Sequence, residues 1–275
     1  MPPESPLANN RTGSLISLVL LAEVCALCLR SWLQGQFESN GISNSKDLSY
    51  LIVLPILLFV LAPVLRDHGQ VILQKLRPKD LSLRIIGTSI LLGIALRVTY
   101  WSGMLVAATA SLPKAAVEHL NETAHIWFSC PGTSTLALHF LVLALLTPLI
   151  EEAIFRGWLL HWLSPHGRWV AIVATATLFA LLHVWQSIPF AFVFGLFAAV
   201  YVLNTGSLWG ALIVHATFNS LIALDWLCMH YVWQPTTQTP ATLLTGIAAL
   251  SIGILALLAS ILLVRSKVAG HAPDD

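Results

Sequence analysis

Long apolar stretches recur along the chain, and they constrain its fold more than any other feature of the sequence. A helix needs roughly 20 mostly apolar residues to cross a bilayer. Only 10% of the 275 residues are charged, well below the roughly 25% typical of soluble domains. We therefore predict an all-α polytopic membrane bundle of about eight transmembrane helices, at about residues 14–33, 50–65, 85–107, 135–163, 169–186, 188–203, 208–228 and 241–264.

The connecting segments predict how these spans are oriented. Residues 66–84 form a hydrophilic connector with five basic residues, whereas the loop at 108–132 has only Lys114. Positively charged short loops stay in the cytoplasm, so eight spans place both termini there. We expect residues 1–13 to be a cytoplasmic N-terminal segment, 14–264 the membrane domain and 265–275 a cytoplasmic tail, in a multi-pass protein of the inner (plasma) membrane.

Charge and cysteine usage exclude some classes of protein. The net charge of +1 gives no basic surface for nucleic acid. The four cysteines lack zinc-finger spacing and are too few for a disulfide scaffold. With eight spans, Cys130 and Cys228 both lie near the outer face, where they could form a disulfide or remain free thiols.

The fourth apolar segment contains charges that are expensive inside a membrane. Glu151, Glu152 and Arg156 interrupt it, and a charge at bilayer depth costs several kcal/mol, so it is normally kept for a function. Glu152 and Arg156 are four residues apart, so they share a helix face and are expected to pair. Glu151 points about 100° away on the helix, which leaves its carboxylate available.

Two later segments carry further polar pairs. Phe179 and His183 are four residues apart on the fifth span, and His215 and Asn219 are four apart on the seventh. At about 1.5 Å per residue, both histidines and the asparagine come to depths that overlap with that of Glu151 near the middle of the membrane. One buried site can therefore contain Glu151, His183, His215 and Asn219.

This set of side chains suits hydrolysis of a peptide bond. A carboxylate in an apolar site can act first as a base towards water and then as an acid. Asn and His can donate hydrogen bonds to a tetrahedral oxyanion, and they act more strongly where bulk water is excluded. The same residues allow a second chemistry, because Glu151, His183 and His215 form a credible zinc set with an open position for water.

The three motifs resemble those of the CPBP family, the CAAX-protease and bacteriocin-processing (Abi) membrane proteins. That family has Glu-Glu-x-x-x-Arg, Phe-x-x-x-His and His-x-x-x-Asn on separate helices. They stand here in the same order, and Phe155 and Gly157 flank Arg156 as is common in the family. The resemblance covers about residues 136–227, with a catalytic core at about 135–228, whereas the first three spans and the last match only in being hydrophobic.

The resemblance implies a glutamic-type intramembrane endopeptidase. Glu151, with His183, is expected to activate water, while His215 and Asn219 hold the oxyanion. Glu152, Arg156 and Phe179 support these groups. We expect no cofactor, with zinc as the alternative. The expected partners are the lipid bilayer and a membrane-associated peptide or protein, cleaved near a CAAX-type tail, a leader or a C-terminal sorting signal.

A reading from another class is a non-enzymatic transporter or scaffold, whose polar network only holds helices together. Two further charges inside apolar spans, Glu23 and Arg97, fit such a structural role if they pair with each other. Replacement of Glu151 by Gln separates this class from the peptidase, because a purely structural network tolerates a nearly isosteric change.

Overall fold

The computed structural model describes residues 6–42, 44–77, 81–116, 133–183, 187–227 and 243–265. Within these ranges the chain is helical and has no strand, so the predicted all-α bundle is confirmed. Cys130 and Cys228, whose pairing the sequence left open, lie outside the described residues.

Every predicted apolar segment contains a helix. The helices are α1 (Pro6–Ser39), α2 (Ser45–Val60), α3 (Ala62–Lys75), α4 (Leu83–Ser111), α9 (Arg168–Leu181), α10 (Ile188–Thr205), α11 (Leu208–Leu227) and α13 (Leu243–Arg265). A long central helix over Ser134–His166 changes its hydrogen-bonding pattern several times. Its parts are α6 (Thr133–His139), η2 (Phe140–Leu146), α7 (Thr147–Glu152), η3 (Ala153–Leu159), α8 (Leu160–Leu163) and η4 (Ser164–His166).

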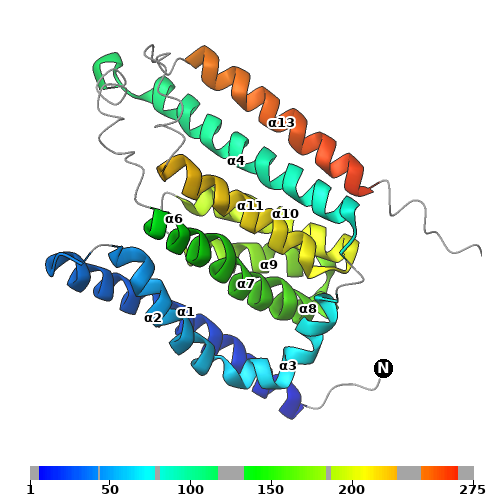
Figure 1. The fold of residues 1–275 in the computed structure, drawn as a ribbon. Helices are drawn as coiled ribbons and strands as arrows, with labels where there is room; N and C mark the ends of the chain where they lie inside the picture. Colours follow the sequence, from blue (N-terminus) through cyan, green and yellow to red (C-terminus); the bar gives the residue numbers. More distant parts are fainter. Residues whose placement is uncertain are drawn as a thin grey trace, which may run out of the picture.

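The helices pack as a layered bundle around the central helix (Figure 1). At one side, α13 packs along α4, and α4 packs along α11. The central helix lies next to α11, and α9 pairs with α10 behind them. At the opposite side, α1 and α2 form an antiparallel pair. The central helix therefore lies between α11 on one side and α2 on the other.

The number of spans is not confirmed by the helix lengths. Among the described residues, four helices are long and apolar enough to cross a membrane, or five if α2 and α3 count as one bent span. The described apolar stretches of α9, α11 and α13 are shorter than these. A multi-pass membrane protein fits these helices, and eight transmembrane helices stays a prediction.

The second span departs from its prediction at its C-terminal end. The sequence predicted one span to about residue 65 and then a connector, but α2 ends at Val60 and α3 begins at Ala62, bent by 84°. Pro63 lies in the first turn of α3. Because proline has no N–H and clashes with the preceding turn, it starts a helix more readily than it continues one. Part of the predicted connector is thus helical.

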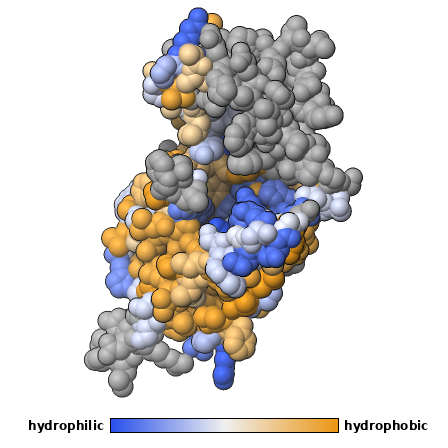
Figure 2. All heavy atoms as spheres, turned by 90° about the vertical axis from the view of Figure 1, so that its left-hand side faces the viewer, coloured by the Kyte–Doolittle hydropathy of each residue, from blue (hydrophilic) through white to orange (hydrophobic). Residues whose placement is uncertain are grey.

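The surface of the bundle exposes many large apolar side chains, which need lipid rather than water around them. Large hydrophobic side chains are exposed on several helices, among them Phe59 at 81%, Leu83 at 87% and Leu255 at 65%. Figure 2 shows the left-hand end of Figure 1, where hydrophobic side chains cover much of the described surface and the largest group of hydrophilic ones lies near its centre. A contiguous apolar surface of this kind is covered by lipid in a polytopic protein.

Close helix contacts depend on glycine at a few positions. A Cβ at Gly93 of α4 would lie 2.8 Å from both Thr217 Cβ and Val214 O of α11. The contact joins α4 to the helix that carries His215 and Asn219. Small residues let membrane helices approach closely where no hydrophobic driving force pulls them together.

We expect Gly93→Ala to lower the free energy of unfolding by about 1–3 kcal/mol, because backbone atoms of α11 would have to move. Gly87→Ala on the same helix is the control, since nothing lies within 4 Å of a Cβ there; it should leave stability unchanged or raise it by up to about 1 kcal/mol. Thermal unfolding in detergent micelles measures both. Equal stability of the two variants would contradict the packing described.

Candidate active site

The first and third motifs meet through a buried carboxylate. Glu152 Oε1 accepts a hydrogen bond from His215 Nδ1 at 2.9 Å and lies 3.2 Å from Arg156 Nη1. The Glu152 and Arg156 side chains are fully buried and His215 nearly so. The predicted pairing of Glu152 with Arg156 is confirmed, and it extends to an imidazole on α11.

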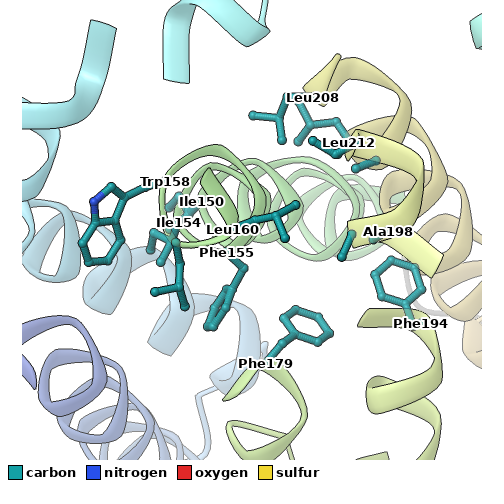
Figure 3. Packing of buried hydrophobic residues seen from close by; sticks show 14 of the residues in the cluster. Ile150, Ile154, Phe155, Trp158, Leu160, Phe179, Phe194, Ala198, Leu208 and Leu212 are labelled. Carbon is teal, nitrogen blue, oxygen red and sulfur yellow. The ribbon is translucent and has the colours of Figure 1, made fainter. Parts of the chain in front are cut away.

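Phe179 of the second motif packs over the ion pair of Glu152 and Arg156. The Arg156 guanidinium lies over the Phe179 ring at 4.3 Å from its centroid. Phe179 also meets Phe155 edge to face at 5.4 Å, and Figure 3 shows the two rings pointing towards each other from α9 and the central helix. A cation over an aromatic face is stabilised, most strongly where water is excluded. Phe179 therefore shields the ion pair from solvent.

Glu151 has a different environment from Glu152. Its side chain is 25% exposed and Oε2 lies 3.7 Å from His215 Nε2, so one imidazole separates the two carboxylates. Glu151 also lines a cavity of about 60 Å³. A cavity needs roughly 10–15 Å³ on this measure to hold one water. The cavity therefore has room for water beside the Glu151 carboxylate.

His183 lines the same cavity. It lies just beyond the end of α9, and its Nδ1 is 2.8 Å from the Phe179 carbonyl oxygen. Since a carbonyl oxygen only accepts, Nδ1 must donate the proton in that bond. In the neutral ring this leaves Nε2 as an acceptor. His183 is thus oriented by its own helix and keeps one nitrogen free for chemistry.

Asn219 is held by the backbone of the central helix. Its Nδ2 donates to the Leu143 carbonyl oxygen at 2.9 Å. Thr147 N–H bonds to Val142 O, five residues back, and the next residue, Pro148, has no N–H to offer Leu143 in that pattern. Asn219 thereby satisfies a carbonyl that the proline leaves without a helical donor.

The structure brings the predicted residues together in part. Glu151 contacts His215 and shares a cavity with His183, whereas His215 and Asn219 do not line that cavity. Asn219 lies one helical turn beyond His215. The four residues predicted to meet thus form one cluster. Its open side faces the cavity and carries Glu151 and His183, and its closed side carries His215 and Asn219.

The sequence did not predict that residues of α1 and α2 would form one wall of the cavity. Glu23 and Arg30 of α1 and Tyr50 of α2 line it together with Glu151. The predicted pairing of Glu23 with Arg97 is wrong, because Arg97 lies over the rings of Tyr100 and Phe218, with α11 and the central helix between α4 and α1 (Figure 1). Charge inside an apolar span was the available signal, but it does not say which helices become neighbours.

A metal site is not formed by the side chains as they stand. Within the described part of the chain, no group of three or more His, Cys, Asp or Glu side chains lies close enough to hold a metal ion. Glu151, His183 and His215, the zinc set considered from the sequence, are therefore not gathered around one point.

Comparison with known proteins finds one match. Residues 133–221 match the family model described as Type II CAAX prenyl endopeptidase Rce1-like. The matched segment contains all three motifs and leaves out α1 to α4 and α13. No curated protein and no solved structure matches the chain.

Breaking the buried ion pair should destabilise the protein strongly. Arg156→Met leaves the Glu152 carboxylate without its cation, and removal of one partner of a buried pair costs about 3–5 kcal/mol. The double variant Glu152→Gln, Arg156→Met should recover part of this loss because no unpaired charge remains. Thermal unfolding in detergent measures both, and a single variant as stable as the wild type would refute this role for the pair.

Proposed function

Since the chain belongs to the Rce1-like family of type II CAAX prenyl endopeptidases through residues 133–221, we propose that it hydrolyses a peptide bond near the end of a membrane-associated substrate, with Glu151 as the general base. The observation that carries this proposal is the cavity shared by Glu151 and His183. It combines a partly exposed carboxylate, an imidazole with a free nitrogen and room for water.

In the proposed reaction, Glu151 and His183 activate one water. The water oxygen attacks the scissile carbonyl carbon, and its proton passes to Glu151. When the tetrahedral intermediate collapses, the C–N bond breaks and Glu151 returns the proton to the leaving amine. The Phe179 carbonyl supports this step by holding His183 Nδ1, which directs Nε2 away from its own helix.

His215 and Asn219 are proposed to stabilise the oxyanion. His215 can donate from Nε2 only as the doubly protonated imidazolium, because Nδ1 already donates to Glu152; Nε2 lies 3.7 Å from the Glu151 carboxylate. Asn219 Nδ2 has two hydrogens, and the bond to the Leu143 carbonyl uses one. Substrate must open the closed side of the cluster to reach both donors. Such donors typically contribute about 10²–10³ in rate.

Glu152 and Arg156 are proposed to act through His215 rather than on substrate. Glu152 accepts from His215 Nδ1 at 2.9 Å, which fixes the ring so that Nε2 faces Glu151. Arg156 balances the charge of Glu152 in a fully buried place. A carboxylate behind a histidine fixes the ring orientation and stabilises the imidazolium, as in other hydrolytic sites.

The setting proposed for this reaction is an inner or plasma membrane that the chain crosses eight times, with both termini in the cytoplasm. The basic connector at 66–84 supports that orientation. CAAX-type tails are the substrates that the family description names, and leaders and C-terminal sorting signals are the alternatives. The reaction is proposed to need no metal, with zinc catalysis on the same residues as the alternative.

Glu151→Gln should lower kcat by about 10²–10⁴ because the isosteric amide cannot accept a proton from water. The control is Glu38→Gln, an exposed glutamate of α1 whose carboxylate accepts hydrogen bonds from Gln34 and Ser45. The assay uses protein purified in detergent and an S-farnesylated peptide ending in a CAAX sequence, with products identified by mass spectrometry. Cleavage by the Glu151→Gln variant at the wild-type rate would refute Glu151 as the general base, whereas no cleavage by the wild type would favour the non-enzymatic scaffold.

Metal analysis of the same preparation separates the two hydrolytic routes. The metal-free route predicts full activity after dialysis against a chelator and substoichiometric zinc in the active protein. Loss of activity on chelation, with recovery on adding zinc, would replace it with zinc catalysis.

A further inference from the structure

A second cavity, the apolar groove, lies between α2, α3 and the central helix. Its volume is about 190 Å³. Its lining consists only of leucine, isoleucine and alanine residues, among them Leu58, Leu61, Leu65, Leu149 and Ile154. Ile150 lines both this groove and the cavity beside Glu151, but no residue of the three motifs lines the groove. The groove is therefore a separate feature from the proposed catalytic cavity.

The groove is open to the surrounding bilayer. Leu58 of α2 and Leu149 of the central helix line it and are 41% and 45% exposed. Apolar cavities stay free of water and bind apolar molecules instead. Where such a cavity opens in the lipid-facing surface of a membrane protein, the apolar molecules that reach it are the acyl chains of lipids.

Basic side chains follow the groove along α3, in the connector that the sequence predicts to be cytoplasmic. His68 and Lys75 continue the face of α3 that carries Leu65, at spacings of three and then seven residues. Both are close enough to His161 of the central helix to interact with it electrostatically. Asp67, the only acidic residue of α3, is exposed. Three basic side chains are thus gathered beyond one end of the apolar groove.

Contacts between α3 and the central helix hold these basic groups in place. The His68 ring packs against Trp158 with 5.8 Å between the ring centroids. Lys75 Nζ lies 3.5 Å and 3.3 Å from the carbonyl oxygens of Arg156 and Gly157. An ammonium group has three N–H donors, so one remains for a ligand. Among the described residues no carboxylate forms an ion pair with Lys75.

The Trp158 indole adds a donor without an acceptor. Trp158 is 2% exposed, and its Nε1 has no hydrogen-bond partner in the described part of the chain. Figure 3 shows its ring on the side of the central helix opposite to Ala198 of α10. A buried N–H without an acceptor is unfavourable, and an oxygen of a ligand bound beside His68 would supply one.

An apolar groove that leads to basic groups matches the two parts of an anionic phospholipid. The groove fits an acyl chain, and a phosphate oxygen accepts hydrogen bonds from ammonium, imidazole and indole donors. Basic pockets between membrane helices on the cytoplasmic side bind anionic headgroups in this way. A zwitterionic lipid has the same chains, but its own cation opposes the basic groups.

We propose that an anionic phospholipid of the membrane binds between α2, α3 and the central helix, with one acyl chain in the apolar groove and its phosphate at His68, Lys75 and His161. The bound lipid holds α3 against Ala153–Leu159, the π-helical segment that follows the two glutamates. The site includes no residue of the three motifs, so the proposal is independent of the catalytic role of Glu151.

The test measures lipid binding by native mass spectrometry of the full-length protein, delipidated in detergent. Dioleoylphosphatidylglycerol is compared with dioleoylphosphatidylcholine, which has the same chains and no net charge. The wild type should bind the anionic lipid about fivefold more tightly or better, as expected for basic residues that face an anionic headgroup. Lys75→Gln should remove this preference, because its amide still donates to the Gly157 carbonyl but carries no charge.

Three further variants make the result specific. Arg168→Gln is the matched control for charge, because Arg168 is exposed and bonds to Asn204; it should keep the wild-type preference. Ala153→Phe places a ring in the groove and should weaken the binding of both lipids. Leu255→Phe, at a 65% exposed position of α13, should change neither affinity.

Equal affinity of the wild type for the two lipids overturns the proposal, even if a variant fails to fold. Equal losses in Lys75→Gln and Arg168→Gln also overturn it, because they assign the preference to the basic surface as a whole. Undiminished binding by a folded Ala153→Phe protein overturns it by placing the acyl chain outside the groove. Displacement of bound phosphatidylglycerol by an S-farnesylated CAAX peptide would overturn it too, because the groove would then belong to the isoprenoid chain of the substrate.

Discussion

The ion pair between Glu152 and Arg156 is the interaction on which the site depends. Both side chains are fully buried in an apolar bundle, where either charge alone would be expensive. The pair does more than neutralise itself. Glu152 also accepts from His215, and Arg156 lies over Phe179. The central helix, α9 and α11 come from different parts of the sequence, and these contacts join them at one point. Glu151 occupies the adjacent position of the central helix.

The backbone of the central helix changes its hydrogen-bonding pattern on both sides of the two glutamates. Two π-helical segments, Phe140–Leu146 and Ala153–Leu159, flank the short α-helical turn that carries both glutamates. Such segments disturb the regular hydrogen bonding and occur often at functional sites. Side chains from elsewhere supply the donors: Asn219 bonds to the Leu143 carbonyl, and Lys75 Nζ reaches the Gly157 carbonyl at 3.3 Å. The motif asparagine has a structural reason to be present as well as a proposed catalytic one.

Local spacing predicted much of this arrangement and long-range packing supplied the rest. Charged and polar residues in apolar segments identified the three motifs, and a separation of four residues predicted the pairing of Glu152 with Arg156, because helix geometry alone fixes it. Spacing could not predict that His215 would lie between two carboxylates, nor that Arg30 and Tyr50 would complete the cavity. Those contacts depend on how helices rotate about their axes, and apolar sequences on all sides leave that rotation undetermined.

The central claim is spatial: His215 is held by Glu152 so that its other nitrogen faces Glu151 inside the protein. An experimental structure of the protein in lipid nanodiscs, at a resolution that shows side chains, tests it most directly. The account predicts Glu152 within hydrogen-bond distance of His215 Nδ1, and Glu151 within about 4 Å of Nε2. A structure with Glu151 facing lipid, or with His215 turned away from both carboxylates, would contradict it.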